Sequence, residues 1–271
     1  MRLKITHNTV YRYDAPVGFV VQSLRTTPSV FEGQKVIDWK VTIDGAEPGP
    51  GFRDGAGDWV QAWTIRGPVT EVPVRIEGEV ETTDLAGVLR GHREMVHPMV
   101  YLQSTEATEA DDALRALAAQ PAPDLAPLDL AHALSALVAD AIAYRPGVTH
   151  LNTTAAEALA LGEGVCQDHA HALIALARER GLPARYVSGY LYADADGAPH
   201  EAAHAWAEIH VGGLGWVGFD AANRTCPDDR YVRTGSGLDA RDAAPIRGVR
   251  ASTGMGAEEL DVTVAVEAVG P

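Results

Sequence analysis

Apolar and polar side chains alternate through most of the first 82 residues. The alternation begins with Leu3, Ile5 and Tyr11 and returns in several later runs. A repeat of two residues is typical of half-buried β-strands, and turn-forming residues separate the runs. The runs cover residues 3–13, 19–24, 37–43, 59–65 and 72–80, with a Gly- and Pro-rich loop over 45–57. Several short antiparallel strands of this kind predict a β-sandwich or barrel.

The pattern changes after an irregular stretch at residues 83–103, which we expect to link two halves of the chain. Apolar residues then recur at helical spacing. The helices predicted in this way cover 107–119, 129–144, a short capped segment from Thr154 to Gly162, and the stretch from Cys166 to Gly181. Thr154 and Glu157 form the capping box of the third helix, while Gly162 and Gly181 are typical helix ends.

Strand-like runs return after the helices, at residues 186–192, 204–210, 216–220 and 260–266. Helices followed by antiparallel strands are typical of α+β proteins. We therefore predict an all-β domain over residues 1–90 and a second, α+β domain over residues 91–271.

Composition and charge narrow the class of protein. Hydrophobic residues make up 46% of the 271 positions, which is enough for a packed core. The 37 acidic and 22 basic residues give a net charge of −15, which argues against nucleic acid and anionic membranes as partners. The first residues lack the apolar core of a signal peptide, and no apolar run is long enough to span a bilayer. We expect a cytoplasmic protein.

Cys166 is the strongest candidate for chemistry. It lies between a loop that contains Gly162 and Gly164 and the start of a predicted helix. A thiol at a helix N-terminus feels the positive end of the helix dipole, which favours the thiolate. A structural cysteine is more typical of the apolar face within a helix. We therefore interpret Cys166 as a nucleophile and Cys226, the second cysteine, as a bystander.

A cysteine nucleophile needs a base and a group that orients the base. Gly212 and Gly213 predict a turn between the strands at 204–210 and 216–220. Antiparallel pairing would bring His204, near the start of one strand, close to Asp220 at the end of the other. The sequence therefore predicts a catalytic triad of Cys166, His204 and Asp220.

Two metal sites are alternatives. His200-Glu201-x-x-His204 matches the zinc-protease motif, which requires both histidines on one helix face. The segment after His204 has strand periodicity instead, and residues four apart in a strand lie roughly 13 Å apart. Cys166, His169 and His171 do not share one helix face either. We therefore expect no metal and no organic cofactor.

Three ordered motifs resemble those of the bacterial transglutaminase-like family. They are the Gly-Val-Cys-Gln-Asp segment around Cys166, the His-Ala-Trp-x-Glu strand from His204, and Trp-x-Gly-Phe-Asp ending at Asp220. Residues 5–28, 183–190 and 242–248 are also similar to that family, so the resemblance covers most of the chain. The chain departs from the family at His169, where an aromatic residue is usual, and at residues 221–222. The resemblance implies a papain/transglutaminase-like core over residues 91–271, in which the nucleophile helix packs on an antiparallel sheet, after the family's N-terminal β domain.

The same resemblance implies acyl transfer through a thioester. Hydrolysis of a peptide or isopeptide bond by a cysteine protease or amidase is the first reading, and the substrate is then a peptide or protein. A transglutaminase that joins the acyl group to an amine is the second. An inactive binding or scaffold protein with the same fold is the third. The Cys166 N–H is one expected oxyanion donor, and Tyr144 or Gln167 could supply the other.

Overall fold

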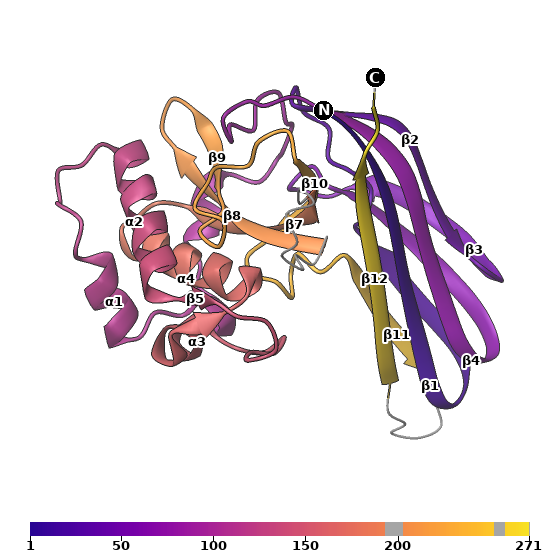
Figure 1. Ribbon diagram of the computed structural model, residues 1–271. Helices are drawn as coiled ribbons and strands as arrows, with labels where there is room; N and C mark the ends of the chain where they lie inside the picture. Colours follow the sequence, from indigo (N-terminus) through magenta and orange to yellow (C-terminus); the bar gives the residue numbers. More distant parts are fainter. Residues whose placement is uncertain (193–202, 252–257, 271) are drawn as a thin grey trace.

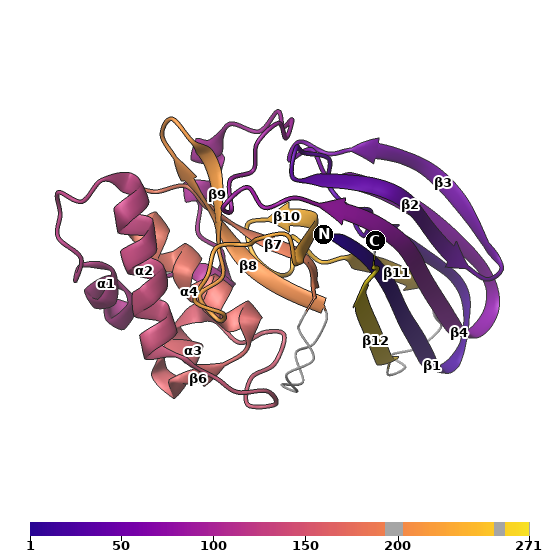
Figure 2. The same ribbon diagram turned by 45° about the horizontal axis from the view of Figure 1, so that its top comes forward.

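The computed structural model describes residues 1–192, 203–251 and 258–270. The chain forms two main antiparallel sheets and a group of helices, with the second sheet between the helices and the first sheet (Figures 1 and 2). The first sheet comprises β1 (Arg2–Leu24), β2 (Gln34–Ile43), β3 (Ala46–Arg53), β4 (Trp59–Thr82), β11 (Ile246–Ala251) and β12 (Glu258–Ala268). The second comprises β7 (Ala184–Leu191), β8 (Ala203–Val211), β9 (Gly215–Phe219) and β10 (Tyr231–Gly237).

The helical part precedes the second sheet in the chain. It contains the 3₁₀ helices η1 (Pro98–Leu102) and η2 (Glu106–Thr108) and the α-helices α1 (Asp112–Ala118), α2 (Pro127–Ala141), α3 (Ala155–Leu161) and α4 (Cys166–Glu179). The short strands β5 (Ala143–Tyr144) and β6 (Glu163–Gly164) pair in parallel between α2 and α4. The predicted α+β class is confirmed. Within the described residues, no helix is long and apolar enough to cross a lipid bilayer.

Two long strands, β1 and β4, run through the whole first sheet. The first half of β1 pairs with β12 and its second half with β11, while β4 pairs with β2 and β3 in the same divided way. One apolar cluster draws on both halves, with Val20 and Ile65 from one and Val74 and Ile76 from the other. The sheet therefore folds over its own apolar side. The expectation of short separate strands was wrong, because β4 continues from residue 59 to 82 without a break.

The C-terminal strands belong to the first sheet. β11 and β12 both pair antiparallel with β1, more than 200 residues earlier in the chain (Figure 2). The predicted second domain, residues 91–271, included these two strands, so their pairing with β1 was not predicted. The apolar alternation in the tail identifies a strand but not its partner, because any sheet edge offers the same backbone groups. The boundary near residue 90 stays a prediction.

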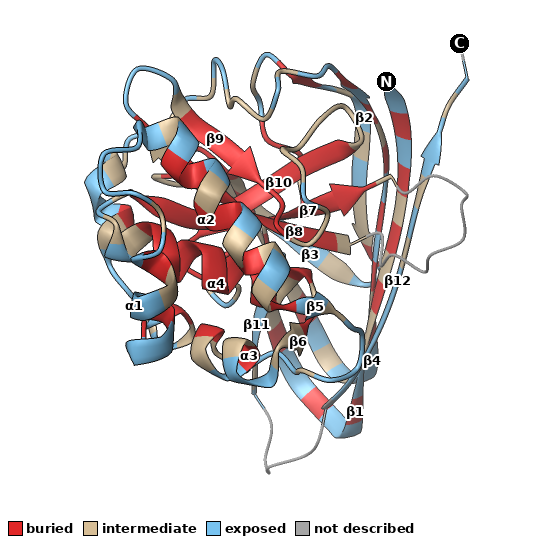
Figure 3. Ribbon diagram, turned by 60° about the vertical axis from the view of Figure 1, so that its left-hand side comes forward, coloured by how far each residue is buried: buried red, intermediate tan, exposed pale blue. Residues whose placement is uncertain are grey.

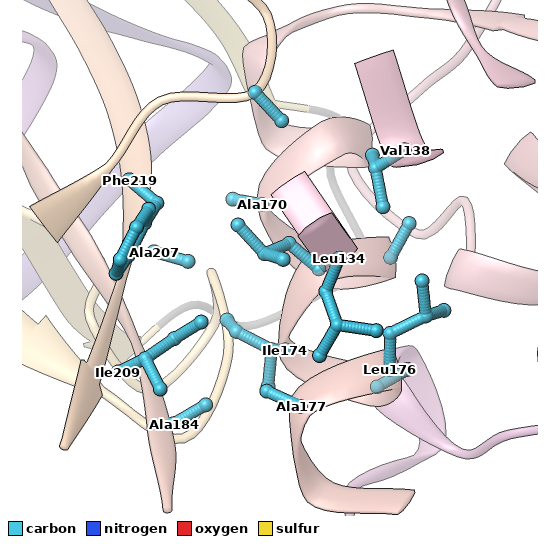
Figure 4. Packing of buried hydrophobic residues seen from close by; sticks show 14 of the residues in the cluster. Leu134, Val138, Ala170, Ile174, Leu176, Ala177, Ala184, Ala207, Ile209 and Phe219 are labelled. Atoms are coloured by element: carbon cyan, nitrogen blue, oxygen red, sulfur yellow. The ribbon is translucent and has the colours of Figure 1, made fainter. Parts of the chain in front are cut away.

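Helix α4 is the centre of the second apolar core. Ala170, Ile174 and Ala177 on one of its faces meet residues of the sheet such as Ala207 and Ile209 (Figure 4). Leu134 and Val138 of α2 pack on the helix from the other side. Small side chains on α4 allow helix and sheet to approach closely. Nearly all of α4 and the second sheet is buried, which fixes the start of α4 relative to β8 and β9 (Figure 3).

Local hydrogen bonds explain where the helices differ from prediction. The predicted helix over 107–119 is divided into η2 and α1, because Asp111 caps a new helix by accepting from the Leu114 N–H at 2.8 Å. Helix α2 ends at Ala141 rather than 144, because Ala143 and Tyr144 pair with β6. Helix α3 begins and ends as predicted, with the Thr154 capping box and Gly162 in the left-handed conformation.

Candidate active site

Cys166 is the first residue of α4, as predicted, and its side chain is buried in the apolar cluster that surrounds the helix. The preceding loop is held in place by Asp168, whose Oδ2 accepts from the Val165 N–H at 2.7 Å and from the Thr149 hydroxyl at 2.6 Å. Gly164 allows this arrangement, since a Cβ there would lie 2.7 Å from the Asp168 side chain. The Asp168 and His169 N–H groups donate to the Val165 carbonyl. An N–H at the first helical position generally has no intrahelical acceptor, so the Cys166 N–H remains a candidate oxyanion donor.

His204 and Asp220 come together from neighbouring strands. His204 lies near the start of β8, and Asp220 follows the last residue of β9. His204 Nε2 lies 2.6 Å from Asp220 Oδ2, and both side chains are buried. Because an ionised carboxylate only accepts, Nε2 carries the proton of this hydrogen bond. The other ring nitrogen, Nδ1, is left for Cys166.

His204 and Asp220 favour each other's charged form. Burial by itself would lower the pKa of His204, but hydrogen bonds to Asp220 and Cys166, together with their charges, raise that pKa to about 10. Burial would raise the pKa of Asp220, and the hydrogen bond and charge of His204 outweigh it and lower that pKa. These opposite shifts favour the imidazolium form of His204 beside the ionised Asp220 at neutral pH.

Two side chains besides His204 bond to Asp220. The Tyr231 hydroxyl donates to Asp220 Oδ2 at 2.8 Å, and the Asn223 side chain donates to the same oxygen at 2.7 Å. The Asn223 backbone N–H donates to Oδ1 at 3.1 Å. The Asp-x-x-Asn spacing is a turn signal, and a turn from Asp220 to Asn223 was the alternative interpretation of Asp220 in the sequence. Tyr231 had no such signal, because strand β10 was not predicted.

Aromatic rings surround His204. The ring of Trp206, two residues along β8, is stacked beside it with centroids 6.4 Å apart. The ring of Tyr231 meets it edge-on at 5.9 Å. These contacts restrict rotation of the imidazole and keep water away from its face.

The two side chains proposed as second oxyanion donors make other contacts near the start of α4. The Gln167 side chain donates to the Leu151 carbonyl at 3.3 Å. Tyr144 lies with its ring 6.3 Å from that of His169. Neither contact assigns the oxyanion role, so the second donor stays a prediction.

The alternative metal sites lack the geometry that they need. His204 lies in a strand that begins at Ala203, whereas the zinc-protease motif needs a helix, and His200 falls outside the described residues. His169 bonds to the carbonyls of Val165 and Ile142, and His171 Nε2 accepts from the Ala240 N–H. Among the described residues, no three His, Cys, Asp or Glu side chains are grouped to hold a metal ion.

Comparison with known families gives two matches that follow one another along the chain. Residues 3–81 match the bacterial transglutaminase-like N-terminal region, and residues 115–221 match the transglutaminase-like superfamily core. The second match contains Cys166, His204 and Asp220.

Similar proteins match over nearly the whole chain. The uncharacterized protein ML0607 of Mycobacterium leprae is 31% identical, over 98% of each chain. The uncharacterized protein Rv2569c of Mycobacterium tuberculosis is 30% identical, over 92% of this chain and 87% of that one. A crystal structure of a candidate cysteine protease from Cytophaga hutchinsonii has the same fold, with a TM-score of 0.74 and 22% identity, over 100% of this chain and 92% of that one.

Proposed function

The chain belongs to the transglutaminase-like superfamily, and on that premise we propose that it is a cysteine-dependent hydrolase of peptide or isopeptide amide bonds. Cys166 is the nucleophile, His204 the acid and base, and Asp220 the group that orients His204. The observation that carries the proposal is the 2.6 Å bond from His204 Nε2 to Asp220, which leaves Nδ1 for the thiol at the start of α4.

The first half of the reaction forms a thioester. The Cys166 thiolate attacks the amide carbonyl carbon, and a bond forms between Sγ and that carbon. When the tetrahedral intermediate collapses, the C–N bond breaks, and the leaving nitrogen takes the proton from His204 Nδ1. The Cys166 N–H at the positive end of α4 is placed to stabilise the oxyanion.

The second half releases the acyl group. His204, now neutral, takes a proton from water as the water oxygen attacks the thioester carbon. The C–S bond breaks, the carboxylic acid leaves, and the pair of thiolate and imidazolium is restored. Asp220 keeps the Nε2 proton in place through both halves, so that Nδ1 is always the nitrogen that exchanges protons. These steps use the three side chains, the Cys166 backbone N–H and water.

We place hydrolysis before transamidation because water reaches a thioester without a binding site. An amine acceptor must be bound while water is excluded. If a primary amine competes with water for the acyl group, the product is a new amide instead of an acid. The same three residues serve both outcomes, so the acceptor is a matter for experiment.

The test is the rate at which iodoacetamide alkylates Cys166 between pH 5 and 9, read residue by residue by mass spectrometry. Cys226 is an internal control, because burial, followed by the charge of Asp84, raises its pKa. We expect Cys166 to react well below the usual thiol pKa of about 8.5, and we expect His204→Ala to abolish this reactivity. Cys166 reacting as slowly as Cys226, with no effect of His204→Ala, would overturn the proposal.

A second assay identifies the acceptor. Peptide amides and isopeptides are incubated with and without a primary alkylamine, and the products are identified by mass spectrometry. If the carboxylic acid is the main product in both incubations, the proposed hydrolysis is supported. If an amide of the added amine is the main product, the reaction is transamidation and the proposal of hydrolysis is wrong.

A further inference from the structure

Asp220 is bonded by a side chain from a strand that carries neither of its proposed catalytic partners. Tyr231 begins β10, which lies at the far edge of the second sheet from β9. Its hydroxyl donates to Asp220 Oδ2, the oxygen that also receives His204 Nε2. Burial and the charge of Asp220 both raise the pKa of Tyr231, so the phenol stays protonated and acts only as a donor across the working range of pH.

The position of this hydroxyl fixes the carboxylate in two ways. Oδ2 receives donors from three directions, so the plane of the carboxylate cannot turn without breaking a short bond. The ring of Tyr231 also meets Trp206 at right angles with centroids 5.5 Å apart, and Trp206 stacks beside His204. Tyr231 therefore contacts both the Asp220 carboxylate and Trp206, the ring that stacks beside His204.

The strand that carries Tyr231 is held by the N-terminal part of the chain. Gln34 bonds to Arg233 as a neighbouring strand would, with Oε1 accepting from the Arg233 N–H and Nε2 donating to the Arg233 carbonyl, each at 2.8 Å. The Ser29 N–H donates to the same carbonyl at 2.8 Å, and the Thr82 hydroxyl donates to the carbonyl of Asp229. The outer edge of β10 is thus paired with groups from the first sheet and its loops.

We propose that Tyr231 is a positioning residue for Asp220, and that the N-terminal region holds it in place through Gln34. The inference rests on the proposed function, because it assigns a role relative to Asp220. It gives the N-terminal sheet a task in the reaction. That sheet supports the strand that aligns the carboxylate.

The experiment compares Tyr231→Phe with Tyr190→Phe. Tyr190 is a matched control, since it is also buried in the second sheet and its hydroxyl also makes one bond to a side chain, His7 Nδ1 at 2.9 Å. We expect Tyr231→Phe to lower kcat by about tenfold to a hundredfold with KM unchanged, since hydrogen bonds to charged groups are the stronger kind. Equal kcat in Tyr231→Phe and wild type, or equal losses in both variants, would overturn the proposal.

The pH profile separates positioning from general loss of stability. The hydroxyl of Tyr231 helps to keep the pKa of Asp220 low. We expect the acid limb of kcat/KM to move to higher pH in Tyr231→Phe and to stay in place in Tyr190→Phe. If Tyr231→Phe does not fold, 3-fluorotyrosine introduced at position 231 answers the question. It keeps the shape and donates more strongly, so the acid limb must move to lower pH, and an unmoved limb contradicts the proposal.

Proton NMR provides a readout that needs no turnover. We expect the Nε2 proton of His204, in a short bond to a carboxylate, to resonate far downfield. We expect Tyr231→Phe to shift it and Tyr190→Phe to leave it. Because this signal reports the His204–Asp220 bond in the free protein, it tests Tyr231 even if no peptide substrate is found. An unshifted resonance in Tyr231→Phe overturns the positioning role.

The role of the N-terminal region has its own pair of variants. Gln34→Ala removes the bonds to β10. The control, Gln61→Ala, removes a glutamine of the same sheet whose side chain, among the described residues, bonds to the Gly49 carbonyl of β3 at 3.4 Å and not to β10. We expect Gln34→Ala to shift the His204 resonance in the same direction as Tyr231→Phe, by a smaller amount. Equal spectra for Gln34→Ala and Gln61→Ala would overturn the part assigned to the N-terminal region.

Discussion

Strand β10 takes part in two buried clusters of charge that have different partners. Tyr231, at its start, bonds to Asp220, whose positive partner is His204. Two residues on, Arg233 bonds to Asp58 at 2.6 Å and to Glu208 at 2.9 Å. The side chains of Asp220, Asp58 and Glu208 are all almost fully buried. The clusters thus share a strand and a degree of burial but differ in the cation.

The identity of the cation decides what each cluster can do. An arginine keeps its proton at every physiological pH, so the charges around Arg233 are permanent. Burial would lower the pKa of Arg233, but Asp58 and Glu208 outweigh it and raise that pKa further. A histidine can give its proton up and take it back, so the cluster around Asp220 can take part in a reaction. The arginine cluster instead joins the two sheets, because Asp58 precedes β4 and Glu208 lies in β8.

The variant with the largest expected effect is His204→Gln, which removes the cation of the Asp220 cluster. Glutamine can fill the site but cannot exchange a proton. We expect kcat/KM for a peptide amide to fall on the order of 10⁴-fold or more, as in other triads that lose their histidine. The free energy of unfolding should fall by only about 1.5–3 kcal/mol, the value of a hydrogen bond to a charged group. Assays of turnover and urea unfolding on the same preparation check both, and a variant that retains activity would contradict the role of His204.

Arg233→Met removes the cation of the other cluster and leaves His204 in place. It leaves Asp58 and Glu208 without their shared cation, although Glu208 keeps its bond to Arg185. We expect the free energy of unfolding to fall by about 3–5 kcal/mol, the usual cost of removing one partner of a buried pair. Urea unfolding followed by tryptophan fluorescence measures it. At temperatures where the variant is folded, Cys166 should still alkylate at low pH, and loss of that reactivity would show that the two clusters are not separate.

The sequence predicted one cluster and not the other, and the reason is the range of the signals. Cys166 was found from two glycines and one helical repeat within 20 residues. His204 and Asp220 were found from two alternating runs and the turn between them. The structure brings the three together, and each signal is local. Arg233 has partners in strand β8 (Glu208) and in loops of the first sheet (Asp58 and Ser29), and no local pattern joins those positions.

Strand β10 shows the same limit within the fold. Its sequence, Tyr-Val-Arg-Thr-Gly-Ser-Gly, contains glycine and serine, which rarely favour strands, yet all seven residues are buried. It is a strand because β7 on one side and Gln34 on the other supply partners for its backbone. Tyr231 was overlooked for that reason. Tertiary pairing decided the structure here, whereas local propensity decided it in α4.

The two clusters also differ in the pH range over which they contribute to stability. The pKa of His204 rises from 6.5 to about 10 on folding, so its contribution is fully present below pH 6.5 and is lost as the pH rises through about 10. Burial would raise the pKa values of Asp58 and Glu208, but the nearby arginines outweigh it and lower both, so their contributions are present above their unfolded pKa values and are lost only in acid.

We therefore expect the free energy of unfolding of the wild type to decline between pH 6.5 and 10, by an amount on the order of 4 kcal/mol, because one pKa unit corresponds to about 1.4 kcal/mol. His204→Gln should lose this decline, and Arg233→Met should keep it, because no group of the arginine cluster titrates in that window. Urea unfolding at pH 6.5, 8 and 10 measures the three slopes. A decline of equal size in wild type and His204→Gln would assign it to other groups.

The smallest expected effect on stability comes from a salt bridge that is exposed rather than buried. Arg224 bonds to Asp140 at 2.7 Å, almost the distance of the Arg233–Asp58 pair, but both side chains are more than half exposed. Water already solvates these charges, so Arg224→Met leaves no stranded ion, and we expect a change of about 0–1 kcal/mol. Arg224 also has a positive φ of 53°, and methionine would keep the same backbone strain. Urea unfolding of Arg224→Met beside Arg233→Met thus compares one bond length at two degrees of burial. If the exposed pair cost as much as the buried one, desolvation would not be what makes Arg233 indispensable, and the contrast between the two clusters on β10 would have to be drawn from geometry alone.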